Sequence, residues 1–334
     1  MRTEAENQTA PVTRVVDLVE AAGRRKASTV VIAGGDRPDD LRLVESARDH
    51  GIVDRILLVG DRGRIARAVE EVGIDIPAGD VIAAEGYDAV AAATVEVLRA
   101  GGVDILLKGN MSTPILNRTM LPLAVRPTAS LVTVFDAAPI ADGRLMLMTD
   151  AGVTTVCTLE RLDDMITNAV DVAREVLGME RPRVAVLSAN EKQITSLPST
   201  KLGLELARRG RPDAWVCGPL SFDLATDPGS VAVKGLPDIP NAERVAGQAD
   251  ILVCPGLDAA NILYKVITAL SKYGQASLAG ITMGFDVPYI IISRADTMET
   301  RLASIALCSL WAQRAAGGTA GPAGSGDPPA GDQS

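Results

Sequence analysis

Short apolar runs that alternate with helical segments constrain the fold of this chain more than any other feature. Residues 250–270, DILVCPGLDAANILYKVITAL, show the unit: the apolar run 251–254 suits a buried strand, a Pro-Gly turn follows, and helical spacing begins after Asp258. The same order of strand, turn and helix recurs along the 334 residues, for example at 29–47. This alternation predicts an α/β protein, and 334 residues are long enough for two lobes with a substantial core.

The helix after Asp258 is expected to have two faces, with its apolar face packed on a sheet and its polar face outward. Spacing alone leaves two interpretations of the polar face open. It is either a solvated surface with Asp258 or a neighbour as the helix cap, or a stripe that faces a ligand. The polar face comprises Asn261, Tyr264, Lys265, Thr268 and Lys272, and the apolar face Ile262, Leu263, Val266, Ile267 and Leu270.

Charge and cysteine usage limit the possible partners. The net charge of −9, without clustered Lys and Arg, argues against a nucleic-acid surface, so an anionic ligand must meet local positive groups. The four cysteines, Cys157, Cys217, Cys254 and Cys308, form no CxxC pair and are expected to be reduced thiols in the cytoplasm. No apolar stretch is long enough to span a bilayer, and the first ten residues contain no hydrophobic signal core, so no membrane partner is expected.

The only histidine, His50, precedes Gly51 at an expected helix end. A C-terminal cap explains it better than catalysis does. A Ser-His-Asp triad or a histidine-rich metal site is therefore poorly supported, and no metal ligand set is expected.

Two strand ends are candidates for anion binding. Lys108 follows the strand in VDILLKGN, and Ser112-Thr113-Pro114 has the pattern of a helix start with free backbone N–H groups, although a helix cap alone would also explain Thr113. The glycine pair 34–35 follows another strand but lacks the GxGxxG and GxxxxGK[ST] patterns. It is interpreted as a tight turn and not as a dinucleotide site.

The last expected strand, 289–293, ends at Ser293 and is followed by Arg294. A guanidinium at a strand end of an open α/β sheet suits phosphate, which it can bind in a bidentate way. Asp296 and Glu299 have the spacing of a capping box, and the sequence leaves open whether they cap the final helix or take part in catalysis.

Several separated segments resemble the phosphate acetyltransferase and phosphate butyryltransferase family, and they are closer to the butyryltransferase branch. They lie between about residue 108 and about residue 307, and their joint agreement is more specific than any single motif. The segments are LLKGNMST, TASLVTVFD, MTDAG, VAVLS, PST, GPLSFDLA, PGLDAANILYK and SRADTMET. The chain departs from the family pattern at Leu131, Cys217 and Thr300, where the family has histidine, aspartate and the aspartate proposed as base in the acetyltransferases.

The resemblance implies a two-lobed α/β fold like that of isocitrate and isopropylmalate dehydrogenases, with an interdomain cleft and usually a homodimer. The first lobe would be 14–135 plus 296–314 and the second 136–295, with disordered ends at 1–13 and 315–334. The implied reaction is acyl-CoA + phosphate = acyl phosphate + CoA, by direct transfer in a ternary complex. Coenzyme A would be a substrate, and no other cofactor is expected.

The resemblance also implies roles for particular residues. Ser293 and Arg294 would be catalytic, with Glu299 or Asp296 as the base. The expected substrate-binding residues are Lys108, Ser112, Thr113, Arg126, Ser130, Thr149, Asp150, Asp258, Asn261, Tyr264 and Lys265.

Two other functions stay open at this point. One is a metal-dependent 2-hydroxyacid dehydrogenase on the same fold, and the other is a non-catalytic subunit that binds CoA or acyl phosphate. The sequence does not indicate the length of the acyl chain.

Overall fold

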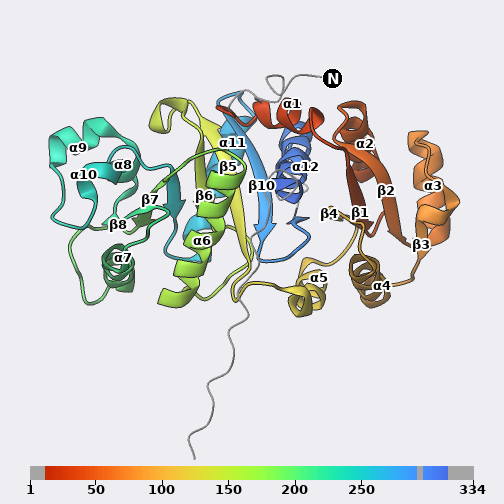
Figure 1. Cartoon of the computed structure of the whole chain (residues 1–334), viewed down its shortest axis with the longest axis horizontal. Helices are drawn as coiled ribbons and strands as arrows, with labels where there is room; N and C mark the ends of the chain where they lie inside the picture. The colour runs from red at the N-terminus through yellow and green to blue at the C-terminus, as the bar shows by residue number, and fades with distance from the viewer. Residues whose placement is uncertain (1–11, 292–295, 315–334) are drawn as a thin grey trace, which may run out of the picture.

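The computed structural model describes residues 12–291 and 296–314, and these form one mixed sheet of 11 strands with helices on both faces (Figure 1). The strand order is β3-β2-β1-β4-β11-β10-β5-β6-β9-β7-β8. The strands are β1 (Ser28–Ala33), β2 (Val53–Gly60), β3 (Val81–Ala83), β4 (Ile105–Lys108), β5 (Ser130–Ala137), β6 (Met146–Thr149), β7 (Arg183–Leu187), β8 (Trp215–Leu220), β9 (Ile251–Val253), β10 (Ala276–Met283) and β11 (Tyr289–Ile290). The helices are α1 (Asp17–Gly23), α2 (Pro38–Asp49), α3 (Arg62–Val72), α4 (Tyr87–Ala100), α5 (Thr113–Met120), α6 (Leu159–Glu175), α7 (Pro198–Arg209), α8 (Phe222–Thr226), α9 (Pro228–Lys234), α10 (Ala242–Val245), α11 (Leu257–Ser271) and α12 (Met298–Ala312). The expected α/β class is confirmed.

Continuous apolar runs form the strands because both faces of the sheet are covered. In β1, Val30 and Ile32 belong to the core cluster that includes residues of α2 and α12, whereas Val31 belongs to the cluster that includes residues of α4 and α5. A strand that is buried on both faces cannot alternate apolar with polar residues, which explains the unbroken apolar runs in the sequence.

The central strands reverse the direction of the sheet. β3, β2, β1, β4 and β11 run parallel to one another, whereas β10 pairs antiparallel with both β11 and β5. β6 pairs antiparallel with β5, and β9, β7 and β8 continue parallel to β6. The two parallel sets therefore point in opposite directions, and each has its own row of carboxyl ends at which ligands can bind. The division into lobes at residues 135 and 296 stays a prediction. Of the ends expected to be disordered, 1–11 and 315–334 lie outside the described residues, whereas residues 12 and 13 are described and the Thr13 N–H donates to Asp17 Oδ2 at 2.9 Å.

The turn after β1 packs tightly against the turn after β4. Gly34 has a φ of +79°, and a Cβ added to it would lie 2.6 Å from the carbonyl oxygen of Asn110. Glycine is therefore required there for both its backbone conformation and its lack of a side chain. The tight turn expected at 34–35 is what the structure shows.

One expectation for α11 is wrong. Ile262 and Val266, expected against the sheet, are 66% and 49% exposed, whereas Thr268, expected outward, is buried. The helix touches β10 and β5 through a narrow stripe that includes Ala260 and Ile267. Apolar residues cover more of this helix than one face can bury, so spacing alone could not select the buried stripe. The N-cap is Gly256, and Asp258 makes no capping hydrogen bond.

The helix-end position expected for His50 is confirmed. His50 is the C-cap residue of α2, and its Nδ1 lies 2.7 Å from the Ser46 carbonyl oxygen. All four cysteines are free. Within residues 12–291 and 296–314, no helix is both long and apolar enough to cross a membrane.

Candidate active site

Lys108 and the start of α5 lie together at the carboxyl end of β4. Lys108 is the last residue of β4, pairs in register with Ala33 of β1 and is half-buried. Ser112 is the N-cap of α5, so the cap role considered for Thr113 is wrong; the Ser112 hydroxyl makes no capping hydrogen bond, and Pro114 lies in the first turn. The first amides of a helix have no intrahelical acceptor, so this turn combines an ammonium group with backbone N–H donors. Such an arrangement can hold an anion.

Helix α5 is joined to β11 by a hydrogen bond that sequence reasoning missed. The Tyr289 hydroxyl donates to Asn117 Oδ1 at 2.8 Å. Burial raises the pKa of Tyr289, and the negative charge of Asp150 raises it further.

Asp150 organises the loop after β6. Its Oδ1 accepts the backbone N–H groups of Leu131, Gly152 and Val153 at 3.0–3.2 Å. Its Oδ2 accepts the Thr154 N–H at 2.7 Å. Burial raises the pKa of this carboxyl, and the four N–H donors counteract that rise by stabilising the anion. These four contacts account for both carboxylate oxygens, so Asp150 shapes the loop.

The loop after β6 also contacts α11. The Asn261 side chain donates from Nδ2 to the Ala151 carbonyl oxygen at 3.0 Å, and Asp258 is exposed in the first turn of the same helix. Thr149 is fully buried, and its Oγ1 has no hydrogen-bond partner within the described part of the chain. The structure therefore brings together the expected site residues of β6 and α11.

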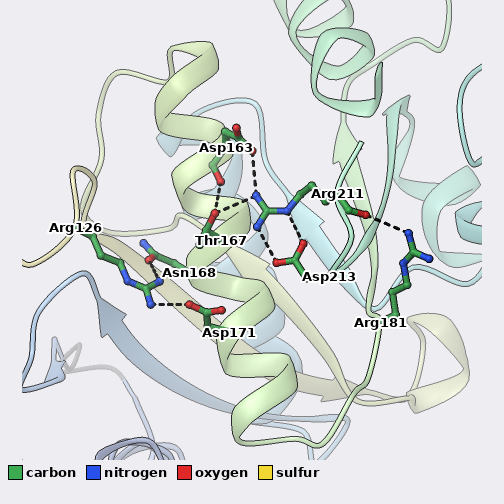
Figure 2. Close-up of polar contacts among 8 residues, drawn as sticks. All are labelled: Arg126, Asp163, Thr167, Asn168, Asp171, Arg181, Arg211 and Asp213. Atoms are coloured by element: carbon green, nitrogen blue, oxygen red, sulfur yellow. Dashed lines mark hydrogen bonds and ion pairs between the residues drawn. The ribbon is translucent and has the colours of Figure 1, made fainter. Parts of the chain in front are cut away.

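The Arg126 guanidinium is directed at helix α6 (Figure 2). Nη1 donates to Asn168 Oδ1 at 2.7 Å, and Nη2 forms an ion pair of 2.6 Å with Asp171. The Asn168 amide in turn donates to Ser130 Oγ at 2.8 Å and to the Thr128 carbonyl oxygen at 3.1 Å. Arg126 and Ser130 are thus joined through a buried asparagine that no sequence pattern marked as functional.

The polar face of α6 also forms contacts with Arg211, near the start of the helix. Arg211 donates to Asp163 at 3.1 Å and to Thr167 at 3.0 Å, and it forms a two-bond pair with Asp213 (Figure 2). These contacts attach α6 to the segment before β8. The helix is therefore a rigid support for the strand β5, which begins at Ser130.

A second group of expected site residues lies where α11 meets the start of α12. The Tyr264 hydroxyl donates to Asp296 Oδ1 at 3.2 Å, and the Lys265 ammonium lies 5.1 Å from the centre of the Tyr264 ring. Thr297 is the N-cap of α12, and its Oγ1 accepts the Thr300 N–H at 3.2 Å. The capping role considered for Asp296 is therefore wrong, because Thr297 takes it.

Glu299 lies in the exposed first turn of α12 and borders a cavity of about 430 Å³. Val15, just before helix α1, and Val19 of α1 form another wall of this cavity. None of the expected phosphate-binding residues lines it. Thr300, which stands where the acetyltransferases have their proposed base, is buried beside Glu299.

The other two departures from the family pattern are core residues. The Leu131 side chain lies between Gly152 and Gly280, where Cβ atoms added to those glycines would approach it to 3.1 and 3.4 Å. Cys217 is fully buried in β8, and burial raises the pKa of its thiol to about 12.

Ser293 and Arg294 lie outside the described residues, so their placement is not part of this geometry. Within the described ranges, no three His, Cys, Asp or Glu side chains are grouped to hold a metal ion.

Comparison with known proteins finds phosphate acetyl- and butyryltransferases by both a family model and individual relatives. A family model described as phosphate acetyl/butaryl transferase matches residues 86–309. The phosphate acetyltransferase of Rhizobium meliloti is 34% identical over 309 residues, which is 89% of this chain and 93% of that protein. The phosphate butyryltransferase of Clostridium acetobutylicum is 30% identical over 302 residues, or 88% and 96% of the two chains.

Solved structures agree with this. The crystal structure of a branched-chain phosphotransacylase from Enterococcus faecalis V583 has a TM-score of 0.67 at 30% identity, covering 84% of this chain and 99% of that one. A phosphotransacetylase from Streptococcus pyogenes has a TM-score of 0.72 at 20% identity, covering 89% of this chain and 98% of that one, and it shows the same fold.

Proposed function

Because this chain belongs to the family of phosphate acetyl- and butyryltransferases, we propose that it transfers the acyl group in one step within a ternary complex. The enzyme exchanges a short-chain acyl group between CoA and phosphate. In the direction of acyl-CoA, the CoA sulfur would attack the carbonyl carbon of acyl phosphate. The carbon–oxygen bond to the phosphoryl group would break, phosphate would leave, and the thiol proton would pass to a carboxylate.

The observation that best supports direct transfer is the state of the possible nucleophiles. The only histidine caps α2, and burial raises the pKa of Cys217 and Cys254 to about 12. A thiol with such a pKa is almost entirely protonated at neutral pH and is a poor nucleophile. An acyl-enzyme on these groups is therefore disfavoured.

A panel of exchange assays tests this proposal. Acetyl-, propionyl- and butyryl-CoA are each incubated with and without phosphate, and thiol release is expected only with phosphate. Labelled phosphate should not exchange into acyl phosphate when CoA is absent, because direct transfer has no acyl-enzyme step. Exchange without CoA would contradict the ternary complex, and the ranking of the three substrates measures the preferred chain length.

The start of α5 supports a phosphate site. Lys108, Ser112 and Thr113 supply an ammonium group, a hydroxyl without a capping bond, and amides at a helix start. We propose that these groups share the phosphate charge with Ser293 and Arg294. Arg126 would contribute only after leaving Asp171, because its guanidinium is paired in the structure.

The exchange of two leaving groups on a carbonyl carbon involves no oxidation, and we propose that CoA is a substrate and no resident cofactor is needed.

Asp296 is the better supported base of the two carboxylates. Thr297 takes the capping role and leaves Asp296 before the helix, where the Tyr264 hydroxyl holds its carboxylate. Glu299 instead borders a cavity that none of the phosphate-binding candidates lines. We propose Asp258, Asn261 and Lys265 as substrate contacts along α11, and Ser130, Thr149 and Asp150 as the opposing wall.

An exposed apolar stripe on α11 supports a homodimer. Ile262 and Val266 are one helical turn apart, and Tyr273, just beyond the helix end, is 81% exposed. Exposed apolar side chains that gather in this way are typical of an interface. We propose a second copy of this chain as its partner, in the cytoplasm, where the four free cysteines would stay reduced.

Substitution of Ile262 by aspartate should convert the dimer to a monomer, because a charge would have to be buried in the interface. Sedimentation velocity measures the change in mass. Val233→Asp is the matched control, because Val233 is 87% exposed on α9 and lies off the stripe. A monomeric wild-type protein, or an Ile262→Asp variant that remains dimeric, would rule out this interface.

A further inference from the structure

A cavity of about 250 Å³ lies at the carboxyl ends of β1, β2 and β3, beside the phosphate-site candidates. Its lining includes Gly34, Asp36, Gly60, Arg64, Tyr87 and Asn110. The carboxyl ends of parallel strands are the usual ligand-binding edge of an open α/β sheet. Asn110 belongs to the turn between Lys108 and Ser112, so this cavity adjoins the proposed phosphate site.

Asp36 gives the cavity an unsatisfied acceptor. Its side chain is only 7% exposed, and Oδ2 pairs with Arg64 Nε at 2.7 Å. Oδ1 is buried and has no hydrogen-bond partner among the described residues. An unsatisfied buried carboxylate oxygen is costly, which favours a ligand that can donate a hydrogen bond to it. The Arg64 guanidinium pairs with Asp36, whereas Asp61, which also lines the cavity, accepts only the Arg64 backbone N–H at 2.7 Å. The lining therefore keeps one carboxylate without an ion-pair partner among the described residues, which favours the neutral adenosine over a phosphate at this spot.

Tyr87 gives the cavity an aromatic wall. It is the first residue of α4 and is 51% exposed, although tyrosine rings usually bury most of their area. Gly86 precedes it with a φ of +80°, so a backbone conformation that favours glycine positions this ring beside the cavity. An exposed aromatic face next to hydrogen-bonding groups is suited to stacking against a nucleobase.

We propose that this cavity binds the adenosine end of coenzyme A. A ribose hydroxyl or the adenine amino group donates to Asp36, and the base stacks on Tyr87. In the strand order β3 lies three places from β4, which corresponds to about 14 Å at about 4.8 Å per strand. CoA would therefore lie across the strand ends, with its adenosine near β3 and its thiol near Lys108 at the end of β4. The inference rests on the proposed phosphate site at Lys108 and adds to it the group that selects CoA over shorter thiols.

A comparison of two substrates tests this inference. Acetyl-CoA and acetyl-pantetheine carry the same thioester, but only the first has an adenosine. Tyr87→Ala and Asp36→Asn should each lower the preference for acetyl-CoA, measured as the ratio of the two kcat/KM values, by about tenfold through loss of stacking or of an acceptor. Because Tyr87 is exposed, its substitution should not unfold the protein, and Tyr87→Phe should keep most of the preference because it retains the ring.

The control is Asp39→Asn, an exposed carboxylate in the first turn of α2 that does not line the cavity, and it should keep the wild-type ratio. A loss of activity that is equal for both substrates would overturn the inference, because it would indicate a structural role. A ratio of the two kcat/KM values that is unchanged in both variants would also overturn the inference. It would mean that the cavity binds a free nucleotide or no ligand. Turnover of acetyl-pantetheine by the wild type, with phosphate, tests the acyl exchange itself and does not depend on this cavity.

Discussion

Replacement of Arg294 by alanine should lower the turnover number by about a hundredfold to a thousandfold, the usual effect of removing a donor that stabilises developing charge. Arg294 comes four residues after the end of β11 in the sequence, and β11 runs parallel to β4 and pairs with it up to Leu107, just before Lys108. A guanidinium there can bind phosphate with two parallel hydrogen bonds. Arg294→Lys should recover only part of the rate, because an ammonium group lacks the planar fork.

Steady-state kinetics in both directions and thermal unfolding measure this effect. Arg42→Ala is the control, since Arg42 is a half-exposed arginine on α2 that pairs only with Asp39 and Glu71 among the described residues. It should leave both activity and stability near wild type. Near-normal turnover of Arg294→Ala would contradict the proposed phosphate site, and so would a loss of turnover that merely follows unfolding.

Replacement of Asp296 by asparagine should lower kcat/KM by about a hundredfold to ten-thousandfold, as expected for loss of a general base. The amide keeps the shape of the side chain and can still accept a hydrogen bond from Tyr264, so the fold should be retained. Glu299→Gln should stay within about threefold of wild type, since removal of a group outside the reaction has little effect. The opposite ranking of the two variants would make Glu299 the base.

A pH profile adds a test of the contact between Tyr264 and Asp296. Burial, and secondarily the charge of Asp296, raises the pKa of Tyr264 well above the ordinary tyrosine range, so this hydroxyl stays a proton donor throughout the assay range. A donor stabilises the ionised carboxylate. Tyr264→Phe removes it, and the acidic limb of kcat/KM should therefore move to higher pH by about one unit. An acidic limb that does not move would show that this tyrosine does not tune the base.

Much of the local structure follows from residues that are close in sequence. The pattern Ser112-Thr113-Pro114 specifies a helix start, and the apolar runs specify strands, because caps, proline positions and periodicity act within a few residues. His50 is a helix cap for the same reason. The family resemblance likewise depends on separated sequence motifs and needed no coordinates.

Expectations that depend on packing do not follow from the spacing of residues along the chain. The spacing of α11 could not show that Ile262 and Val266 would be exposed, because burial depends on which neighbour covers each side of a helix. The capping-box spacing of Asp296 and Glu299 left open whether Asp296 caps the final helix, and the folded chain uses Thr297 instead.

The sequence by itself determined the class of fold, the positions of most strands and helices, and the family, because these depend on local chemistry and on motifs that survive in order along the chain. Only the tertiary structure decided that Arg126 pairs with Asp171 of α6, that Asp150 gathers four amides, and that Asp36 and Tyr87 border one cavity. Arg126 and Asp171 are 45 residues apart, and Asp36 and Tyr87 are 51 apart. Such contacts exist because the strand order of the sheet brings distant segments together, and no local pattern records that order.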